Sequence, residues 1–298
     1  MSSVTEVLKR LRVERGDGFA LDAFSPSDTG GLATSKKEAQ QQLHEEWLAR
    51  LPGLQERLWA TDRWAVLLIF QGMDASGKDG VIKHVMSGVN PQGCQVTSFK
   101  VPSEEELDHD YLWRTTRALP ERGRIGIFNR SYYEEVLVVR VHAAVLARQK
   151  LPPRLVGPDL WRQRFEDIAA FERYLTRNGT VVVKFFLHMS REEQRRRFLD
   201  RLERPEKRWK FSLGDVAERR HWDRYMAAYE EMIRHTAAPH APWYVVPADH
   251  KWFARLVVAA VVVSTLESLD LEFPAVDAAH LADLEEARRQ LVAEGGGG

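Results

Sequence analysis

The sequence Trp64-Ala65-Val66-Leu67-Leu68-Ile69-Phe70 is followed, after one glutamine, by Gly72-Met73-Asp74-Ala75-Ser76-Gly77-Lys78-Asp79-Gly80. The first segment is almost entirely apolar, which predicts a buried strand. The second has the spacing of a phosphate-binding loop, in which backbone N–H groups and the start of the next helix bind phosphate oxygens. We therefore expect a protein that binds phosphate, with Lys78 reaching the transferred group. The predicted phosphate-binding residues of the loop are Gly72, Ala75, Ser76, Gly77, Lys78, Asp79 and Gly80.

Two carboxylates distinguish this loop from the usual one. Asp79 stands where most such loops have a Ser or Thr that binds Mg²⁺, and Asp74 lies inside the loop. Carboxylates beside phosphate repel it unless a cation lies between them, so we predict that Asp74 is a Mg²⁺ ligand. The sequence suggests no role for Asp79. The alternative is a chance match, and the strand before the loop and the helix-compatible residues 81–89 after it favour a true loop.

The composition limits the compartment and the partners that we expect. Lys and Arg together number 43, as do Asp and Glu, so no overall positive field favours nucleic acid. The single cysteine excludes an internal disulfide, and the N-terminus does not resemble a signal peptide, so we expect a cytoplasmic protein. The apolar run at residues 256–263 is too short to span a bilayer, so we expect a buried helix and no membrane partner.

Alternating strand and helix patterns predict the fold class. Five strands are expected at residues 64–70, 94–101, 124–128, 180–188 and 243–246, with helices between them and a leading helix over residues 35–58. This order predicts a three-layer α/β/α sandwich around a five-stranded, mostly parallel sheet. We expect residues 1–35 to be a polar N-terminal extension, residues 36–275 a single domain, and residues 276–298 a C-terminal helix with a flexible glycine tail.

Polar residues follow the third predicted strand. Ligands bind beyond the carboxyl ends of parallel strands, so this segment should face the same crevice as Lys78. Arg130 is expected to stabilise charge on the transferred phosphate, and Glu134 or Glu135 to complete the metal site with Asp74. A surface ion pair at a helix start is the alternative. Asn129 stands where many phosphate-loop enzymes have an aspartate, which increases the importance of the other carboxylates.

A basic segment at residues 191–220 follows the fourth predicted strand. At this position, phosphate-loop kinases of small molecules have a closing lid. Helical spacing predicts that Arg197, Arg201 and Arg204 share one face. One triphosphate would not need all the basic side chains of this segment, whereas a long polyanion would. The alternative is a solvated helix whose basic residues pair with neighbouring carboxylates.

A predicted helix at residues 104–117 is the candidate acceptor site. Asp110 and Arg114 are four residues apart and would share a helix face, either as a simple ion pair or as a clamp on the acceptor. The sequence leaves both possibilities open. Arg117 lies one turn beyond Arg114 on the same predicted helix.

Four strings together resemble the polyphosphate kinase 2 family over about residues 20–275. They are Gln71-Gly72-Met73-Asp74-Ala75-Ser76-Gly77-Lys78-Asp79-Gly80, Phe128-Asn129-Arg130-Ser131-Tyr132-Tyr133-Glu134-Glu135-Val136-Leu137-Val138, Lys207-Arg208-Trp209-Lys210-Phe211 and Ala241-Pro242-Trp243-Tyr244-Val245-Val246-Pro247-Ala248-Asp249. The resemblance implies a thymidylate-kinase-like phosphate-loop fold and Mg²⁺-dependent, reversible phosphoryl transfer between inorganic polyphosphate and nucleotides. It also implies a homodimer or homotetramer.

The resemblance also implies roles for particular residues. Asp74, Lys78, Arg130 and Glu135 would be catalytic, with Asp74 and Glu135 as metal ligands. The polyphosphate track would comprise Arg201, Lys207 and Lys210. The nucleotide acceptor would lie near Asp110, Arg114, Arg117, Asn129 and Glu134. The pair Asn129-Arg130 is similar to the subgroup that accepts nucleoside mono- and diphosphates.

Two other functions remain open from the residues alone. An ATP-dependent nucleoside monophosphate kinase would share the phosphate loop, although the dense basic lid argues against it. A non-catalytic polyanion-binding protein would use the same loop only to hold anions.

Overall fold

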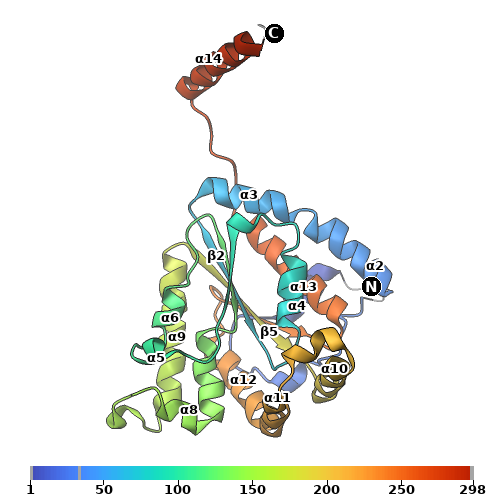
Figure 1. Ribbon diagram of the computed structural model, residues 1–298, viewed down its shortest axis with the longest axis vertical. Helices are drawn as coiled ribbons and strands as arrows, with labels where there is room; N and C mark the ends of the chain where they lie inside the picture. The colour runs from blue at the N-terminus through green and yellow to red at the C-terminus, as the bar shows by residue number, and fades with distance from the viewer. Residues whose placement is uncertain (1–2, 33–34, 296–298) are drawn as a thin grey trace.

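A six-stranded sheet forms the centre of the molecule (Figure 1). The computed structural model describes residues 3–32 and 35–295, and the side chains of Lys36, Ala39 and Lys210 lie outside that description. All neighbouring strands are parallel except β1, which is antiparallel to β6. In spatial order the strands are β1 (Arg12–Val13), β6 (Trp243–Pro247), β5 (Thr180–His188), β2 (Ala65–Gln71), β4 (Ile125–Asn129) and β3 (Cys94–Ser98).

The sheet has a hydrophobic core on each face, because side chains alternate along every strand. On β2, Val66, Leu68 and Phe70 join one buried cluster, whereas Leu67 and Ile69 join the other. The first cluster packs against α1 (Val4–Leu11), α3 (Leu51–Thr61), α4 (Lys78–Val85) and α13 (Lys251–Glu267). The second packs against α9 (Leu160–Arg177) and α12 (Trp222–Thr236). The predicted α/β class and mostly parallel sheet are confirmed.

The prediction of five strands was wrong, because it missed β1. This strand lies in the segment that the sequence predicted to be a polar extension, and Arg12 pairs with Tyr244 of β6. The preceding helix α1 begins with a capping box formed by Ser3 and Glu6 and buries its apolar side. Two residues are too few to show the alternation that reveals a strand, which explains the omission.

Several helix boundaries also differ from the expected ones. The predicted leading helix is divided into α2 (Lys36–Gln42), the π-helical turn η2 (Leu43–Leu48) and α3. The predicted helix at residues 104–117 is two short helices, α5 (Glu104–Leu107) and α6 (Trp113–Thr116), and β3 ends at Ser98. No helix in the described ranges is long and apolar enough to cross a membrane, and the apolar run at residues 256–263 lies buried in α13.

The remaining helical elements connect these layers. Between β1 and β4 are η1 (Leu21–Ala23) and η3 (Pro91–Gly93); after β4 come η4 (Tyr132–Val136), α7 (Val138–Val141), α8 (Ala143–Ala147) and η5 (Pro153–Leu155). After β5 come α10 (Arg191–Glu203), η6 (Pro205–Lys210), α11 (Leu213–Glu218) and η7 (Arg219–His221). The last helix, α14 (Ala278–Gly295), projects from the body of the molecule (Figure 1).

Candidate active site

The phosphate loop joins β2 to α4 and is held in a conformation that its glycines permit. Gly72 has φ 151°, and a Cβ there would lie 2.9 Å from the carbonyl oxygen of Leu187. Gly77 has φ 106°, and Ala75 also has a positive φ, 67°. A non-glycine residue in this region is strained and occurs mainly where function requires it. The tight loop predicted from the sequence is therefore present.

Lys78 is buried at the start of α4 and folds back across the loop. Its Nζ donates to the carbonyl oxygens of Gly72 at 2.6 Å and Met73 at 3.3 Å. Burial, and to a lesser degree the charge of Arg130, lowers the pKa of Lys78 to about 8. A buried ammonium beside a phosphate loop is placed to bind an anion.

Arg130 connects the phosphate loop to the segment after β4. The strands β2 and β4 are adjacent and parallel, so their carboxyl ends bring together residues that are 56 positions apart. The Arg130 guanidinium bonds to the carboxylate of Asp74 and, at 3.0 Å, to that of Glu134. Glu134 is the main reason why the pKa of Arg130 is raised. The structure thus places a fixed cation between two carboxylates at the mouth of the loop.

Asp79, for which the sequence suggested no role, bonds to the strand end beside it. Its Oδ1 accepts a hydrogen bond of 2.6 Å from the Asn129 amide. An aspartate at position 129 would instead face this carboxylate with a second negative charge. The two departures from the usual phosphate-loop pattern therefore compensate each other and tie α4 to β4.

Glu135 lines the same cavity as Asp74, and its partners are Gln149 and Arg164. Its buried carboxylate accepts from the Gln149 amide and pairs with Arg164 at 3.2 Å. Burial raises the pKa of Glu135 despite that pairing. Consistent with this arrangement, the described residues contain no cluster of three or more His, Cys, Asp or Glu side chains that could hold a metal ion. The site nevertheless fits Mg²⁺, because this ion usually takes one or two protein carboxylates and fills its shell with water and substrate phosphates.

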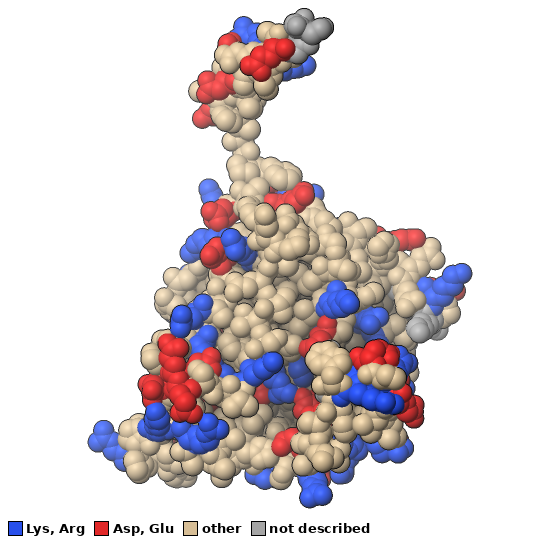
Figure 2. Space-filling view, viewed as in Figure 1, with Lys and Arg blue, Asp and Glu red and all other residues tan. Residues whose placement is uncertain are grey.

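Two cavities meet at Arg130. One, of 630 Å³, is lined by the phosphate loop and by the predicted lid. The other, of 480 Å³, is lined by apolar side chains such as Phe99 and Val138 and by charged ones that include Glu134 and Glu135. Both are lined by Asp74, Phe99, Lys100 and Arg130. Figure 2 shows Lys, Arg, Asp and Glu side chains around the hollow in this face of the molecule. We call the first the donor cavity and the second the acceptor cavity.

Only part of the predicted acceptor set lines the acceptor cavity. Arg114 does so, and its guanidinium donates to the carbonyl oxygen of Lys100 at 2.9 Å. Asp110 lies between α5 and α6 and accepts from the backbone N–H of Leu112, so it does not share a helix face with Arg114. Arg117 stacks on the ring of Trp113, 4.6 Å from its centroid. Asn129 lines the donor cavity instead.

The basic segment contributes several cations to the donor cavity. Arg197, Arg201 and Lys207 line it, with the Lys207 Nζ 3.3 Å from the Asp200 carboxylate. Arg204 lies beyond the end of α10 and pairs with Asp200, and Arg197 is buried toward the phosphate loop. The prediction that Arg197, Arg201 and Arg204 share one face is confirmed for Arg197 and Arg201, which both line this cavity, and was wrong for Arg204. The predicted contact of Lys210 lies outside the described side chains.

Two lysines that line the donor cavity were missed by the sequence reasoning. Lys100 lies just after β3 and also lines the acceptor cavity, and Lys251 begins α13, shortly after β6. Both follow parallel strands of the sheet. The rule that ligands bind at carboxyl strand ends could have identified them from the predicted strands.

The sheet order and these cavities define a class of protein. A phosphate loop after a central parallel strand, with neighbours on both sides that come later in the chain, is the arrangement of phosphate-loop kinases. The model of the family described as polyphosphate kinase 2 matches residues 33–274. The chain belongs to the polyphosphate kinase 2 family.

Individual relatives are similar over nearly the whole chain. An ADP-polyphosphate phosphotransferase of Rhodopseudomonas palustris is 51% identical and covers 95% of this chain and 98% of its own. An AMP/ADP-polyphosphate phosphotransferase of Meiothermus ruber is 46% identical, and the match covers 90% of this chain and 96% of that protein. The crystal structure of polyphosphate kinase 2 from Arthrobacter aurescens matches with a TM-score of 0.85 at 40% identity, covering 98% of this chain and 97% of that one.

Proposed function

We propose that the protein is a polyphosphate-dependent nucleotide kinase. It transfers the terminal phosphoryl group of inorganic polyphosphate to a nucleoside diphosphate or monophosphate, reversibly and with Mg²⁺. The observation that carries this proposal is the meeting of the donor and acceptor cavities at Asp74, Lys100 and Arg130. The names of the relatives from Rhodopseudomonas palustris and Meiothermus ruber support it.

The donor cavity suits a chain of phosphates. Its lining includes the phosphate loop with Lys78, and also Arg201, Lys207 and Lys251. A single transferred phosphoryl group needs only the phosphate loop and Lys78. Cations that continue from the loop to the lid would bind the following phosphates of the same chain.

Transfer in this site requires positioning and charge neutralisation, with no covalent protein intermediate. Lys78 and the loop hold the terminal phosphate, and the Arg130 guanidinium, already fixed by Asp74 and Glu134, neutralises charge on the group in transit. We assign Asp74 as the carboxylate that holds Mg²⁺ together with the phosphates. When bound, this ion supplies further neutralisation of the phosphate oxygens.

The acceptor nucleotide would occupy the cavity on the other side of Arg130. Its apolar side chains suit a base and ribose, and Arg114 and Glu134 lie where a phosphate and a polar group would approach. We therefore retain Arg114 and Glu134 as acceptor residues.

A donor comparison tests the proposal. The purified protein with Mg²⁺ receives either polyphosphate plus AMP or ADP, or ATP plus AMP, and the products are measured by chromatography. We expect much faster turnover with polyphosphate. Equal or faster turnover from ATP would favour an ordinary nucleoside monophosphate kinase.

Two variants separate catalysis from simple anion binding. We expect Lys78→Ala and Asp74→Asn to abolish transfer while circular dichroism shows an intact fold. A polyanion-binding protein would have no transfer rate to lose. Retained transfer in both variants would show that the reaction takes place elsewhere.

Assembly and compartment stay predictions. A homodimer or homotetramer is expected, and light scattering of the purified chain would test it. A cytoplasmic location is expected, and fractionation of the source cells would test that.

A further inference from the structure

Every carbonyl oxygen of the phosphate loop from Gly72 to Gly77 accepts a hydrogen bond. Lys78 donates to the carbonyl oxygens of Gly72 and Met73. The backbone N–H of Val81, in α4, donates to the carbonyl oxygen of Gly77. The three carbonyls in the middle of the loop have partners from a different part of the chain. The Gln194 amide donates to Asp74 at 2.9 Å, and one Arg197 nitrogen donates to Ala75 at 2.9 Å and Ser76 at 2.8 Å.

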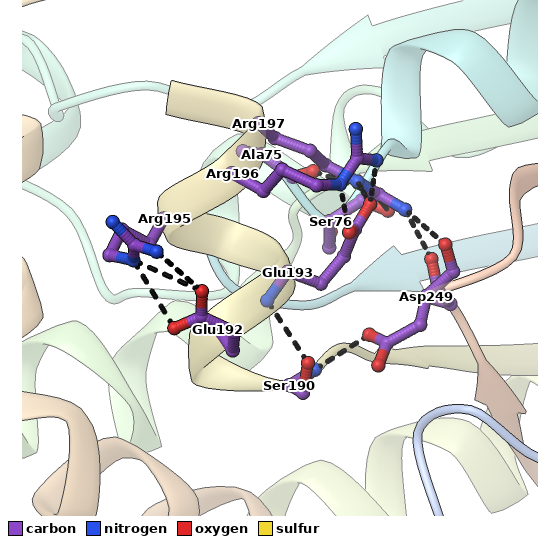
Figure 3. Close-up of polar contacts among 10 residues, drawn as sticks. Ala75, Ser76, Ser190, Glu192, Glu193, Arg195, Arg196, Arg197 and Asp249 are labelled. Carbon is purple, nitrogen blue, oxygen red and sulfur yellow. Dashed lines mark hydrogen bonds and ion pairs between the residues drawn. The ribbon is translucent and has the colours of Figure 1, made fainter. Parts of the chain in front are cut away.

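Gln194 and Arg197 are three residues apart on α10, so both lie on the side of this helix that faces the loop. They are 1% and 5% exposed, respectively. Figure 3 shows the Arg197 guanidinium reaching from α10 to the loop and to the backbone at Asp249. A buried polar side chain is stable only when its donors are satisfied, and here the loop carbonyls satisfy them.

Further bonds hold these two side chains in place. Arg197 also donates to Ala248 and, at 2.6 Å, to the carboxylate of Glu193. The Gln194 side-chain oxygen accepts from Arg219 at 2.7 Å, which determines the orientation of its amide. Both groups are therefore preorganised rather than free to follow the loop.

Peptide geometry connects these bonds to phosphate binding. In a planar trans peptide the C=O and the next N–H point in opposite directions. Holding the carbonyls of Asp74 and Ser76 toward α10 directs the N–H groups of Ala75 and Gly77 away from it. Backbone N–H groups of these loops are the phosphate ligands. The positive φ of Ala75, 67°, is a conformation that such external bonds can maintain.

We propose that Gln194 and Arg197 are positioning residues, which hold the phosphate loop in its phosphate-binding shape by fixing three consecutive carbonyls. This inference rests on the proposed function, because it assigns the loop to the polyphosphate donor. The same clamp sets the distance between the loop and Arg201, one turn further along α10. The donor cavity thus depends on contact between the phosphate loop and α10.

Arg197→Lys is the main test. Lysine keeps the charge beside Glu193 but cannot hold the carbonyls of the loop and of Ala248 and Asp249 together. We expect kcat/KM for polyphosphate to fall about 100-fold, the effect of misplacing a reacting group by about 1 Å. The loss should be the same for inorganic tripolyphosphate and for long chains, because both use the loop. The dissociation constant of AMP, measured by calorimetry, should remain within about twofold of wild type.

Gln194→Glu is a second, nearly isosteric variant. Its carboxylate still accepts from Arg219 but no longer donates to the Asp74 carbonyl. We expect about a tenfold loss in kcat/KM for polyphosphate, as for one lost hydrogen bond that leaves its partner unpaired. This variant decides the question if Arg197→Lys does not fold.

Arg196→Lys is the matched control. Arg196 neighbours Arg197 and pairs with the same Glu193, but it is exposed and bonds to no loop carbonyl in the described structure. Activity within about twofold of wild type is expected. Threefold or smaller losses in both Arg197→Lys and Gln194→Glu would overturn the inference, as would an equal loss of AMP affinity, which would indicate a general structural role.

The outcome is separable from that of the proposed function. A wild-type protein without polyphosphate-dependent transfer would overturn the proposed function alone. Binding of inorganic tripolyphosphate to wild type and to Arg197→Lys would still decide the inference, with weaker binding to the variant supporting it and equal binding overturning it.

Discussion

Burial of Lys78 predicts a pH dependence of donor use. Its pKa is lowered to about 8 in the free protein, so the ammonium is lost as the pH rises through that value. Phosphate binding requires the ammonium. We expect kcat/KM for polyphosphate to fall above about pH 8, whereas kcat, which reports the phosphate-bound state, should fall at higher pH. Initial rates at constant ionic strength would show this, and a profile that is flat to about pH 9.5 would contradict it.

The lowered pKa of Lys78 also makes the free energy of unfolding depend on pH, but this quantity should rise with pH, whereas donor use should fall. The folded-state pKa of Lys78 lies below the ordinary value of 10.5, so the unfolded chain binds more protons between about pH 8 and pH 10.5. The contribution of Lys78 to the free energy of unfolding should therefore rise with pH in this window. The difference between wild type and Lys78→Met in urea unfolding at pH 7.5 and pH 10 isolates this contribution.

Glu135→Gln distinguishes a structural carboxylate from a metal ligand. Arg164 is 3% exposed and would lose its charged partner, which costs roughly 3 kcal/mol or more in the free energy of unfolding. Denaturant unfolding would measure this loss. The Mg²⁺ concentration for half-maximal transfer should stay within about twofold of wild type. A large increase in that concentration would instead support the predicted role of Glu135 as a ligand.

Residues within one motif were easier to predict than the directions of their side chains. Asp74, Lys78 and Arg130 were identified because a local pattern and the parallel-strand rule place them at one sheet edge. Glu134 and Glu135 are adjacent in a 3₁₀ turn, so their side chains diverge: one pairs with Arg130 and the other with Arg164. No local pattern states which of two neighbours turns toward the loop.

Among the elements, the predicted lid at residues 191–220 yields a prediction about chain length. Lys207 lies in η6, outside the phosphate loop, and lines the donor cavity. We expect Lys207→Ala to raise the KM for long-chain polyphosphate several-fold while leaving tripolyphosphate use nearly unchanged, because only a long chain extends to this position. Arg195→Ala, which removes an exposed cation of α10 paired with Glu192, is the control. No change across chain lengths would return Lys207 to a surface role.

The helix α10 also shows how packing changes the interpretation of a charge pattern. Regular spacing suggested one basic face, but α10 ends before Arg204 and its inner side packs on the phosphate loop. Arg197 therefore donates to the backbone of the loop while it also lines the donor cavity. Helical periodicity defines faces, whereas contact with other elements defines which face is buried.

For the whole molecule, the N-terminal segment contrasts with the C-terminal one. Val4, Val7 and Leu11 are buried in one core cluster and Val13 in the other. Each buried side chain of this size contributes roughly 1.5–3 kcal/mol. We expect deletion of residues 1–15 to lower the midpoint of thermal unfolding by more than about 10 °C.

Deletion of residues 276–298 provides the comparison. The described side chains of α14 are exposed, so the midpoint should change by less than about 2 °C. Scanning calorimetry of both variants would test the pair. An N-terminal deletion as stable as the C-terminal one would show that α1 and β1 contribute little to the core.

The amino-acid sequence was sufficient to predict the phosphate loop, the α/β class, the strand end that carries Arg130 and the resemblance to the polyphosphate kinase 2 family. These features are encoded in short patterns, because backbone conformation and burial follow from local spacing. Packing in three dimensions determined the sixth strand, the direction of Glu135, the cavity lysines Lys100 and Lys251 and the hold of Gln194 and Arg197 on the loop. These depend on contacts between segments far apart in the chain, where no local periodicity records which side chains will meet.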